Sequence, residues 1–221
     1  AGVAGNGQNE LVAALSGESR DGLTGRVSLS GVDITARGVS GRRAAGLATV
    51  PEERNGHAAV PGMSLAENAI LSARQRRGLA SGGLLKLGKA SAYAAEIIRA
   101  FSVRATGPQA AASSLSGGNL QKYIMGREIM QEPAVLVVAQ PTWGVDAGAA
   151  GFIRQSMLDL AARGSAVVVV SQDLDELLEI SDRIAVINGG RLSQPHPVGA
   201  ITLEEIGLLM GGVHGDGAGE T

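Results

Sequence analysis

The pattern of hydrophobic and polar positions is helical at the start of the chain and then becomes strand-like. Residues 8–16 carry Leu11 and Leu15 four positions apart, the spacing of one helix face, so a short helix is predicted there. Residues 25–34 alternate as a strand does, with a glycine turn near their end. A second short helix and a strand that ends before Pro51 are predicted next.

From Ser64 onward the pattern favours helices. Ser64 and Glu67 have the spacing of a capping box, in which each side chain satisfies a free backbone N–H of the other. A second amphipathic helix is predicted over residues 90–104. Residues 74–89, basic and rich in glycine, are expected to form a flexible, solvated connector between the two helices.

After residue 130 strands and helices alternate, and the strands are almost continuously apolar. This combination is typical of a parallel sheet covered by helices on both faces. The predicted strands are 134–139, 165–170 and 183–187, and the predicted helices are 149–163 and 174–180. A hairpin turn is predicted at 187–192, and the tail 213–221 is expected to be disordered because it shows no periodicity.

Composition narrows the possible classes of protein. The chain has 221 residues, 44% hydrophobic and 18% charged, which is typical of a globular protein. A net charge of −2 gives no general attraction to nucleic acid, and aromatic residues, at 2%, offer few surfaces on which bases could stack. Cysteine is absent, which excludes disulfides and thiolate metal sites. No apolar run approaches the roughly 20 residues of a membrane span, so contact with a membrane would require a partner.

A glycine-rich segment, residues 2–9, precedes the first predicted helix and is called the phosphate loop below. Gly2 and Gly7 match the G-x-x-x-x-G frame in which backbone N–H groups and a helix dipole face phosphate oxygens. Gln8 and Asn9 stand where lysine and a hydroxyl residue are expected, and an ordinary glycine turn before a helix is the alternative. No strand precedes the loop, which favours a segment truncated at its N-terminus.

Two further segments carry candidate chemistry. Residues 115–122, LSGGNLQK, form the signature segment, in which Ser116 can cap a following helix and two bare glycine backbones can approach a ligand; an ordinary helix start is the alternative. Residues 134–146 form an apolar strand that ends in Ala139 and Gln140. Strands of this kind in nucleotide-hydrolysing proteins usually end in two acidic residues, and here both are missing.

Taken in order, these segments resemble the ATP-binding domain of ABC transporters over residues 2 to about 212. Four segments more narrowly resemble the second half of the tandem ATPase subunits of bacterial sugar and nucleoside importers: PEER (51–54), GMSLAENAIL (62–71), LSGGNLQK (115–122) and EEIGLLMGG (204–212). The resemblance implies an α/β fold: a P-loop NTPase (RecA-like) core with a parallel sheet, a small antiparallel β part and an inserted helical subdomain. The implied domain covers 1–212, with its core in 1–62 and 133–212 and its helical subdomain in 63–132.

The resemblance also implies roles for individual residues. It assigns to the Walker A loop Gly2, Gly5, Asn6, Gly7, Gln8 and Asn9. It assigns to the signature motif Ser116, Gly117, Gly118, Asn119 and Gln121. It places Glu52 at the Q-loop glutamine, Asp146 at the D-loop aspartate, and Gln140 and Gln172 at the catalytic glutamate and the switch histidine.

The departures from this pattern predict a degenerate site with no metal ligands of its own. Gln8 removes an ammonium whose pairing with phosphate at 4 Å is worth roughly 4 kcal/mol near a surface. Ala139 offers no support to a metal ion, and Gln140 cannot accept a proton as a base. Gln172 can donate a hydrogen bond but cannot change its charge. Hydrolysis by this half alone is therefore expected to be deficient, because charge stabilisation dominates phosphoryl transfer.

In this family two such domains meet head to tail, so the signature motif closes over a nucleotide held by the other half. The resemblance therefore implies ATP and Mg²⁺ held mainly by a partner, the first half of the same polypeptide. It also implies transmembrane permease subunits, an indirect link to a periplasmic or lipid-anchored substrate-binding protein, and a peripheral position on the cytoplasmic face of the membrane. Nucleic acid is not expected as a partner.

Two alternatives remain open. One is a non-catalytic structural or regulatory pseudo-ATPase module; the other, less favoured, is a nucleic-acid-linked ABC ATPase, which would need intact carboxylates and long or basic insertions. Asp173 and Glu176 fit a helix-capping pair. Trp143 has no assigned role, and the histidines show no metal spacing.

Overall fold

The computed structural model describes residues 1–20 and 22–212. Contacts divide the chain into two compact units, which are described separately: residues 14–169, and residues 1–13 together with the chain from residue 170 onward. Helix α1 (Gln8–Ser16) begins in the smaller unit and ends in the larger one, and its bounds match the predicted helix. The predicted tail 213–221 lies outside the described residues.

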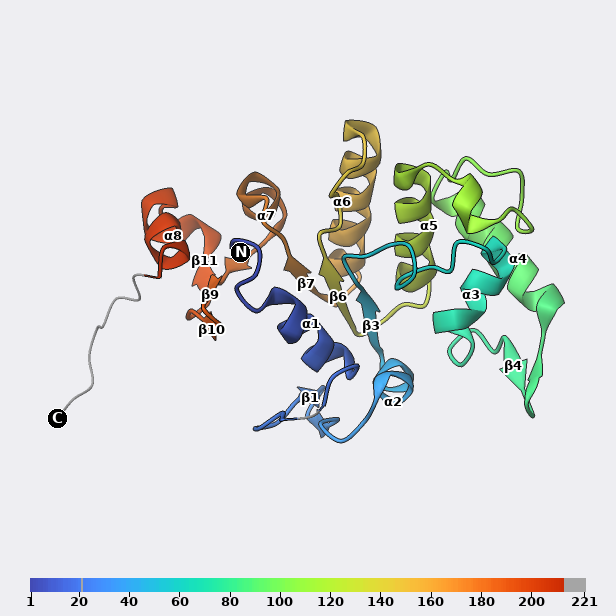
Figure 1. The fold of residues 1–221 in the computed structure, drawn as a ribbon, viewed down its shortest axis with the longest axis horizontal. Coiled ribbons are helices and arrows are strands. Elements are labelled where there is room, and N and C mark those ends of the chain that lie inside the picture. Colours follow the sequence, from blue (N-terminus) through green and yellow to red (C-terminus); the bar gives the residue numbers. More distant parts are fainter. Residues whose placement is uncertain (21, 213–221) are drawn as a thin grey trace. The chain divides into compact units, whose positions relative to one another are not determined.

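The larger unit is built on a three-stranded sheet with the order β3-β6-β7 (Figure 1). Strands β3 (Leu47–Val50) and β6 (Val135–Ala139) are parallel, and β7 (Ala166–Val170) continues the sheet. Residues of β3 and β6 are almost entirely buried, as continuous apolar strands of a parallel sheet require. The parallel sheet is thereby confirmed.

Short elements surround this sheet. Strands β1 (Ser28–Leu29) and β2 (Val32–Asp33) form an antiparallel pair around the predicted glycine turn. Helix α2 (Val39–Ala45) precedes β3, and helix α6 (Ala147–Ala162) follows β6. The β1–β2 pair supplies the small antiparallel part that the sequence predicted.

Three helices form the helical part of the larger unit: α3 (Leu65–Ala73), α4 (Leu87–Ala100) and α5 (Gly117–Ile129). They pack against one another, and α5 also packs on α6 (Figure 1). A short 3-10 turn, η1 (Ala112–Ser114), leads into α5. The predicted capping box is confirmed, because Ser64 Oγ accepts from Glu67 N and Ser64 N donates to the Glu67 carboxylate. All three helices lie within 63–132, and the subdomain boundaries themselves stay a prediction.

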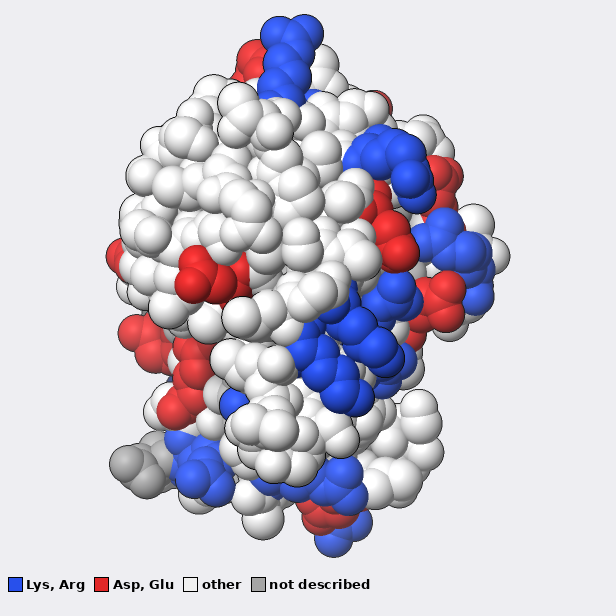
Figure 2. All heavy atoms as spheres, turned by 90° about the vertical axis from the view of Figure 1, so that its right-hand side faces the viewer, with Lys and Arg blue, Asp and Glu red and all other residues white. Residues whose placement is uncertain are grey.

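The connector 74–89 is largely exposed to solvent, as predicted, but it is not an irregular loop. This segment contains an antiparallel pair, β4 (Ala80–Ser81) and β5 (Leu84–Leu85), whose turn is made by Gly82 and Gly83 at positive φ. Arg77 is also fixed, since its guanidinium lies 4.5 Å above the Tyr93 ring. Figure 2 looks onto this side of the molecule, where much of the surface is uncharged and Lys and Arg gather in one group near the centre of the view, with Asp and Glu beside it.

A buried ion cluster ties the helical part to the sheet. The carboxylate of Glu128 on α5 accepts from Arg43 on α2 at 2.6 Å, from Arg127 at 2.8 Å and from Ser72 on α3 at 2.6 Å. Burial alone would raise the pKa of Glu128, but the two guanidinium groups and the Ser72 hydroxyl lower it. Because three elements meet at one carboxylate, the cluster fixes the position of helix α5.

The smaller unit contains the phosphate loop, helix α7 and a set of short strands. Helix α7 (Leu174–Ile180) matches the prediction; Asp173 caps it by accepting from Glu176 N, while the Glu176 carboxylate accepts from Ser171 instead of returning the bond. The strand predicted at 183–187 is divided into β8 (Arg183–Ile184) and β9 (Ile187–Asn188).

The remaining elements of this unit follow β9. Strand β9 pairs with β10 (Arg191–Leu192) across Gly189 and Gly190, which confirms the predicted hairpin. Strand β11 (His196–Pro197) pairs with β8, and η2 (Val198–Ala200) and α8 (Leu203–Met210) complete the described chain.

Candidate functional site

The predicted site residues are distributed over both units. The phosphate loop and Gln172 belong to the smaller unit, whereas Glu52, the signature segment, Gln140 and Asp146 belong to the larger one. The geometry of each group is therefore given within its own unit.

The phosphate loop is held by the β9–β10 hairpin. Asn6 Oδ1 accepts from Gly189 N at 2.8 Å, and Asn6 O accepts from Gly190 N at 2.9 Å. Gly2 packs so closely that a Cβ there would lie 2.6 Å from Ile187 O, and Gly7 has φ +108°, so both positions require glycine. The glycines of the predicted frame are thus explained by packing and backbone conformation in this unit.

The Gln8 side chain folds back over the loop. Its Oε1 accepts from Asn6 N at 2.9 Å, and its Nε2 donates to Val3 O at 2.7 Å. Asn6 Nδ2 donates to the same Val3 carbonyl at 2.8 Å. One backbone N–H that would face a phosphate in a working loop is therefore satisfied by the loop's own side chain.

In the signature segment, by contrast, several donors at the start of α5 are left unsatisfied. Ser116 is the N-cap residue of α5, but its side chain makes no capping bond, so the prediction that it caps the helix through its hydroxyl is wrong. Asn119 lies one turn on and donates to Ser116 Oγ at 2.9 Å, which engages the oxygen as an acceptor. The hydroxyl proton and the N–H groups of Gly117, Gly118 and Asn119 have no acceptor within the described parts of the chain.

Two other signature residues are engaged internally. Asn119 Oδ1 accepts from Arg104 N at 2.8 Å, and the buried Gln121 donates to Pro141 O at 2.9 Å. Gln121 thereby joins α5 to the loop that follows β6, which is a structural contact. The role of Gln121 in nucleotide binding stays a prediction.

The end of strand β6 is buried and keeps an unusual backbone. Ala139 is 3% exposed and Gln140 is 7% exposed. Gln140 has φ +47°, a left-handed conformation that is uncommon for residues other than glycine and is often found at functional sites. Asp146 caps α6 by accepting from Ala149 N at 2.9 Å, and that bond is the main cause of its lowered pKa. This strand end can position groups, but it offers neither a base nor a carboxylate for a metal ion.

Glu52 and Gln172 are both exposed. Arg54, two residues after Glu52, is half-buried beside the signature segment, a position that the sequence did not predict. A Cβ built on Gly117 would lie 3.0 Å from Arg54 Nη1, and one on Gly144 would lie 3.5 Å from Nη2. Partial burial lowers the pKa of Arg54, although arginine stays cationic at neutral pH. Only the folded chain brings this cation to the start of α5, and no periodic signal in the sequence marks it.

The residues of the phosphate loop do not fit a Mg²⁺ site. Mg²⁺ at nucleotide sites is usually held by one or two protein carboxylates together with waters and substrate phosphates, and residues 2–9 contain no carboxylate. Within residues 1–20 and 22–212 there is no group of three or more His, Asp or Glu side chains that could hold a metal ion. The start of α5 fits a phosphate better, since it presents free N–H groups, a hydroxyl proton and a nearby guanidinium.

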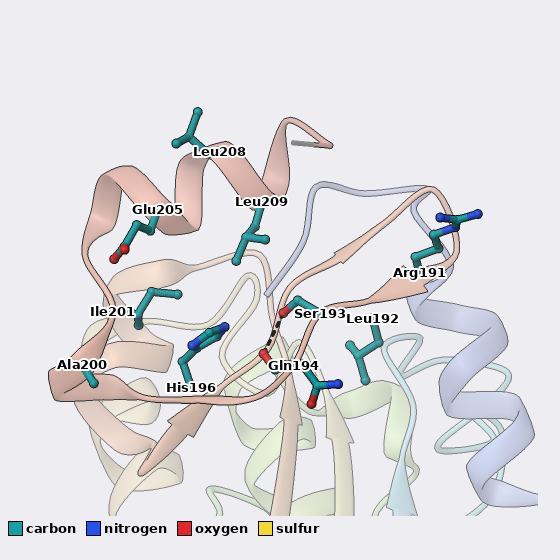
Figure 3. Close-up of a pocket in the computed structure, with 10 residues that line it drawn as sticks. All are labelled: Arg191, Leu192, Ser193, Gln194, His196, Ala200, Ile201, Glu205, Leu208 and Leu209. Carbon is teal, nitrogen blue, oxygen red and sulfur yellow. Dashed lines mark hydrogen bonds between the residues drawn. The ribbon is translucent and has the colours of Figure 1, made fainter. Parts of the chain in front are cut away.

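The smaller unit also contains a cavity of about 620 Å³ between α8 and the segment 191–201 (Figure 3). Its apolar lining comes from Leu192, Ile201 and Leu209, with His196 and Glu205 at its polar side. Neither the phosphate loop nor Gln172 lines it, so it is separate from the predicted site residues. In the described part of the chain no helix is both long and apolar enough to cross a bilayer.

Solved structures of similar fold identify the architecture. An ATP-binding subunit of an ABC transporter superposes with a TM-score of 0.74 over 96% of this chain and 86% of that chain, at 19% identity. A cassette solved as a dimer in a post-hydrolysis state with ADP and Pi gives 0.73 over 89% and 83%, also at 19% identity. The chain has the fold of an ABC ATP-binding cassette. The implied P-loop α/β fold is thereby confirmed.

Proteins of similar sequence are import ATP-binding proteins. It is 39% identical over 212 residues to the nucleoside import ATP-binding protein NupA of Lactococcus lactis, covering 96% of the cassette and 42% of that protein. It is 39% identical over 214 residues to the glucose import ATP-binding protein TsgD13 of Haloferax volcanii, covering 96% and 39%. No family model matches the chain. The cassette is therefore homologous to ATP-binding subunits of sugar and nucleoside importers, and it spans about 40% of the length of these relatives.

Proposed function

We propose that the cassette is one ATP-binding half of an importer ATPase for sugars or nucleosides, and that it donates its signature segment to an ATP site completed by another cassette. The observation that carries this proposal is the start of α5, where backbone N–H groups are free and the Ser116 hydroxyl does not cap the helix. The names of the relatives, which are nucleoside and glucose import proteins, support the class of substrate.

The same proposal assigns no hydrolysis to the cassette's own phosphate loop. When bound, ATP supplies the γ-phosphoryl group that water attacks. In this cassette Gln8 satisfies the loop from within, and Ala139 and Gln140 offer neither metal support nor a base. ATP and Mg²⁺ would therefore be held mainly by the phosphate loop and carboxylates of the other cassette, in the first half of the same polypeptide.

Further partners follow from the importer class. The proposal includes transmembrane permease subunits, an indirect link to a substrate-binding protein, and a peripheral position on the cytoplasmic face of the membrane. The loop 52–63 resembles the region that such domains use to contact a transmembrane helix, which supports this part of the proposal.

The alternative is a pseudo-ATPase module that stabilises a partner without taking part in hydrolysis. ATP turnover by the intact subunit separates the two. Ser116→Arg should abolish turnover because the new side chain fills the anion-facing start of α5, whereas Gln8→Lys should change it by less than about twofold because the loop still lacks carboxylates. Turnover that survives Ser116→Arg would favour the pseudo-ATPase module.

A further inference from the structure

Arg54 has an unusual position for a charged side chain. It is half-buried, and within residues 1–20 and 22–212 its guanidinium makes no hydrogen bond or ion pair. Other arginines at comparable or greater depth are engaged. Arg43 and Arg127 pair with Glu128, and the Arg42 guanidinium donates to four backbone carbonyls, those of Ala14, Leu15, Thr35 and Arg37. Because Arg54 stays partly exposed and has no anion among the described residues, its charge is available to an anion from outside.

Two glycines make room for this side chain. Gly117 opens helix α5, and Gly144 lies in the loop between β6 and α6 at φ +62°. A Cβ at Gly117 would lie 3.0 Å from Arg54 Nη1, so the guanidinium lies directly beside the start of α5. The guanidinium is thus held between the signature segment and the loop that ends in Asp146.

The nearest acidic group does not neutralise it. A Cβ on Gly118 would lie 3.1 Å from Asp146 Oδ2, so this carboxylate borders the same region. Asp146 is engaged as the cap of α6 through Ala149 N, and no ion pair joins it to Arg54 in the described chain. The region therefore combines one free guanidinium with three free N–H groups and the Ser116 hydroxyl proton.

We infer that Arg54 is a phosphate-binding residue of the ATP site that the signature segment completes, where it adds a full positive charge to the dipole of α5. The inference rests on the proposed function and extends it to a residue outside the signature segment. Hydrogen bonds from a charged donor are stronger than those from backbone amides, and an arginine fork suits a phosphate geometrically. The negative charge of the terminal phosphate would be shared between Arg54 and the start of α5.

The test is steady-state ATP turnover by the intact subunit with Arg54→Gln, Arg54→Lys and Arg54→Met. Loss of one charge-assisted hydrogen bond predicts a fall in kcat/KM of roughly ten- to a hundredfold for Arg54→Gln, carried mainly by a higher KM for ATP. Arg54→Lys should recover part of this loss, and Arg54→Met should recover none. Arg99→Gln is the matched control, because Arg99 is exposed on α4; it should leave turnover unchanged.

Two results would overturn the inference: wild-type turnover in Arg54→Gln, or recovery by Arg54→Met equal to that by Arg54→Lys, since charge would then be unimportant. A thermal melt of each variant of residues 1–221 separates a loss of phosphate binding from a loss of folding. Ser116→Arg measured in parallel keeps the two proposals distinct. If it abolishes turnover while Arg54→Gln does not, only the role of Arg54 fails; if it leaves turnover intact, the proposed function itself fails.

Discussion

The phosphate loop and the signature segment are both glycine-rich turns that lead into a helix, yet their polar groups have opposite states. In the loop, Gln8 and Asn6 satisfy the backbone from within, and the β9–β10 hairpin holds the result in place. In the signature segment, the Ser116 hydroxyl makes no cap and Arg54 has no anion among the described residues. This difference supports the proposal that an anion binds at the signature segment, whereas in the phosphate loop a side-chain amide occupies the backbone N–H.

The largest change in turnover is expected when the same negative charge is added to each of the two segments. In the intact subunit, Gly117→Asp should lower turnover by at least about a hundredfold, because a carboxylate there would pair with Arg54 and repel phosphate. Gly5→Asp is the matched change in the phosphate loop: Gly5 has φ +83° and no neighbour within 4 Å of a Cβ, and aspartate tolerates that backbone. It should leave turnover near the wild-type rate. Equal losses in the two variants would contradict the contrast between the segments.

A second test concerns what holds the signature helix. Glu128→Gln removes the anion between two buried guanidinium groups, so the free energy of unfolding should fall by about 3 kcal/mol in chemical denaturation followed by circular dichroism. Glu96→Gln is the control, because the Arg77–Glu96 pair at 3.2 Å is solvent-exposed and should be worth less than about 1 kcal/mol. Similar effects from the two variants would show that the cluster does not fix α5.

The same cluster gives the chain a pH dependence. The folded pKa of Glu128 is lowered, so its contribution to stability is complete above the ordinary glutamate pKa of about 4.3 and is lost as the pH falls through the lower folded value. In Glu128→Gln this acid-induced loss should be smaller than in the wild-type chain.

The smallest expected effect is in the phosphate loop. Gln8→Ala removes the acceptor of Asn6 N and one donor to Val3 O, which should cost about 1 kcal/mol locally and speed hydrogen exchange at the Asn6 amide. Gln194→Ala is the control in the same unit, since its side chain is exposed. Unchanged exchange at Asn6 would show that Gln8 does not close the loop.

The sequence predicted those elements whose signals are local. Helices α1 and α7 match their predicted bounds because leucine spacing, glycine and an aspartate cap mark their ends. The β4–β5 pair was missed because strands of two residues have no periodicity, and its segment resembled a basic loop. The Ser116 cap failed because Asn119, one turn on, donates to that hydroxyl.

The candidate site was predictable in part. The fold and the homology to importer subunits agree with the resemblance that the segments carried. The roles of the individual site residues stay predictions, and two features could not be read from the chain at all. The hydrogen bond from Gln8 Nε2 to Val3 O depends on the backbone conformation of the loop. The position of Arg54 beside Gly117 depends on contacts between segments far apart in sequence.

Gln140 has a consequence for how the site could change over time. Its left-handed backbone costs of order 1–3 kcal/mol. The fold tolerates this cost even though no catalytic glutamate stands at position 140. A change to glutamate would keep the size and the backbone posture of this residue, so its obstacle would be electrostatic: a carboxylate only 7% exposed, with no added cation to match it. Ionising such a glutamate would be unfavourable until a metal ion or a basic partner came with it. Restoring chemistry here would therefore require at least two changes made together, which makes the present state resistant to single reversals.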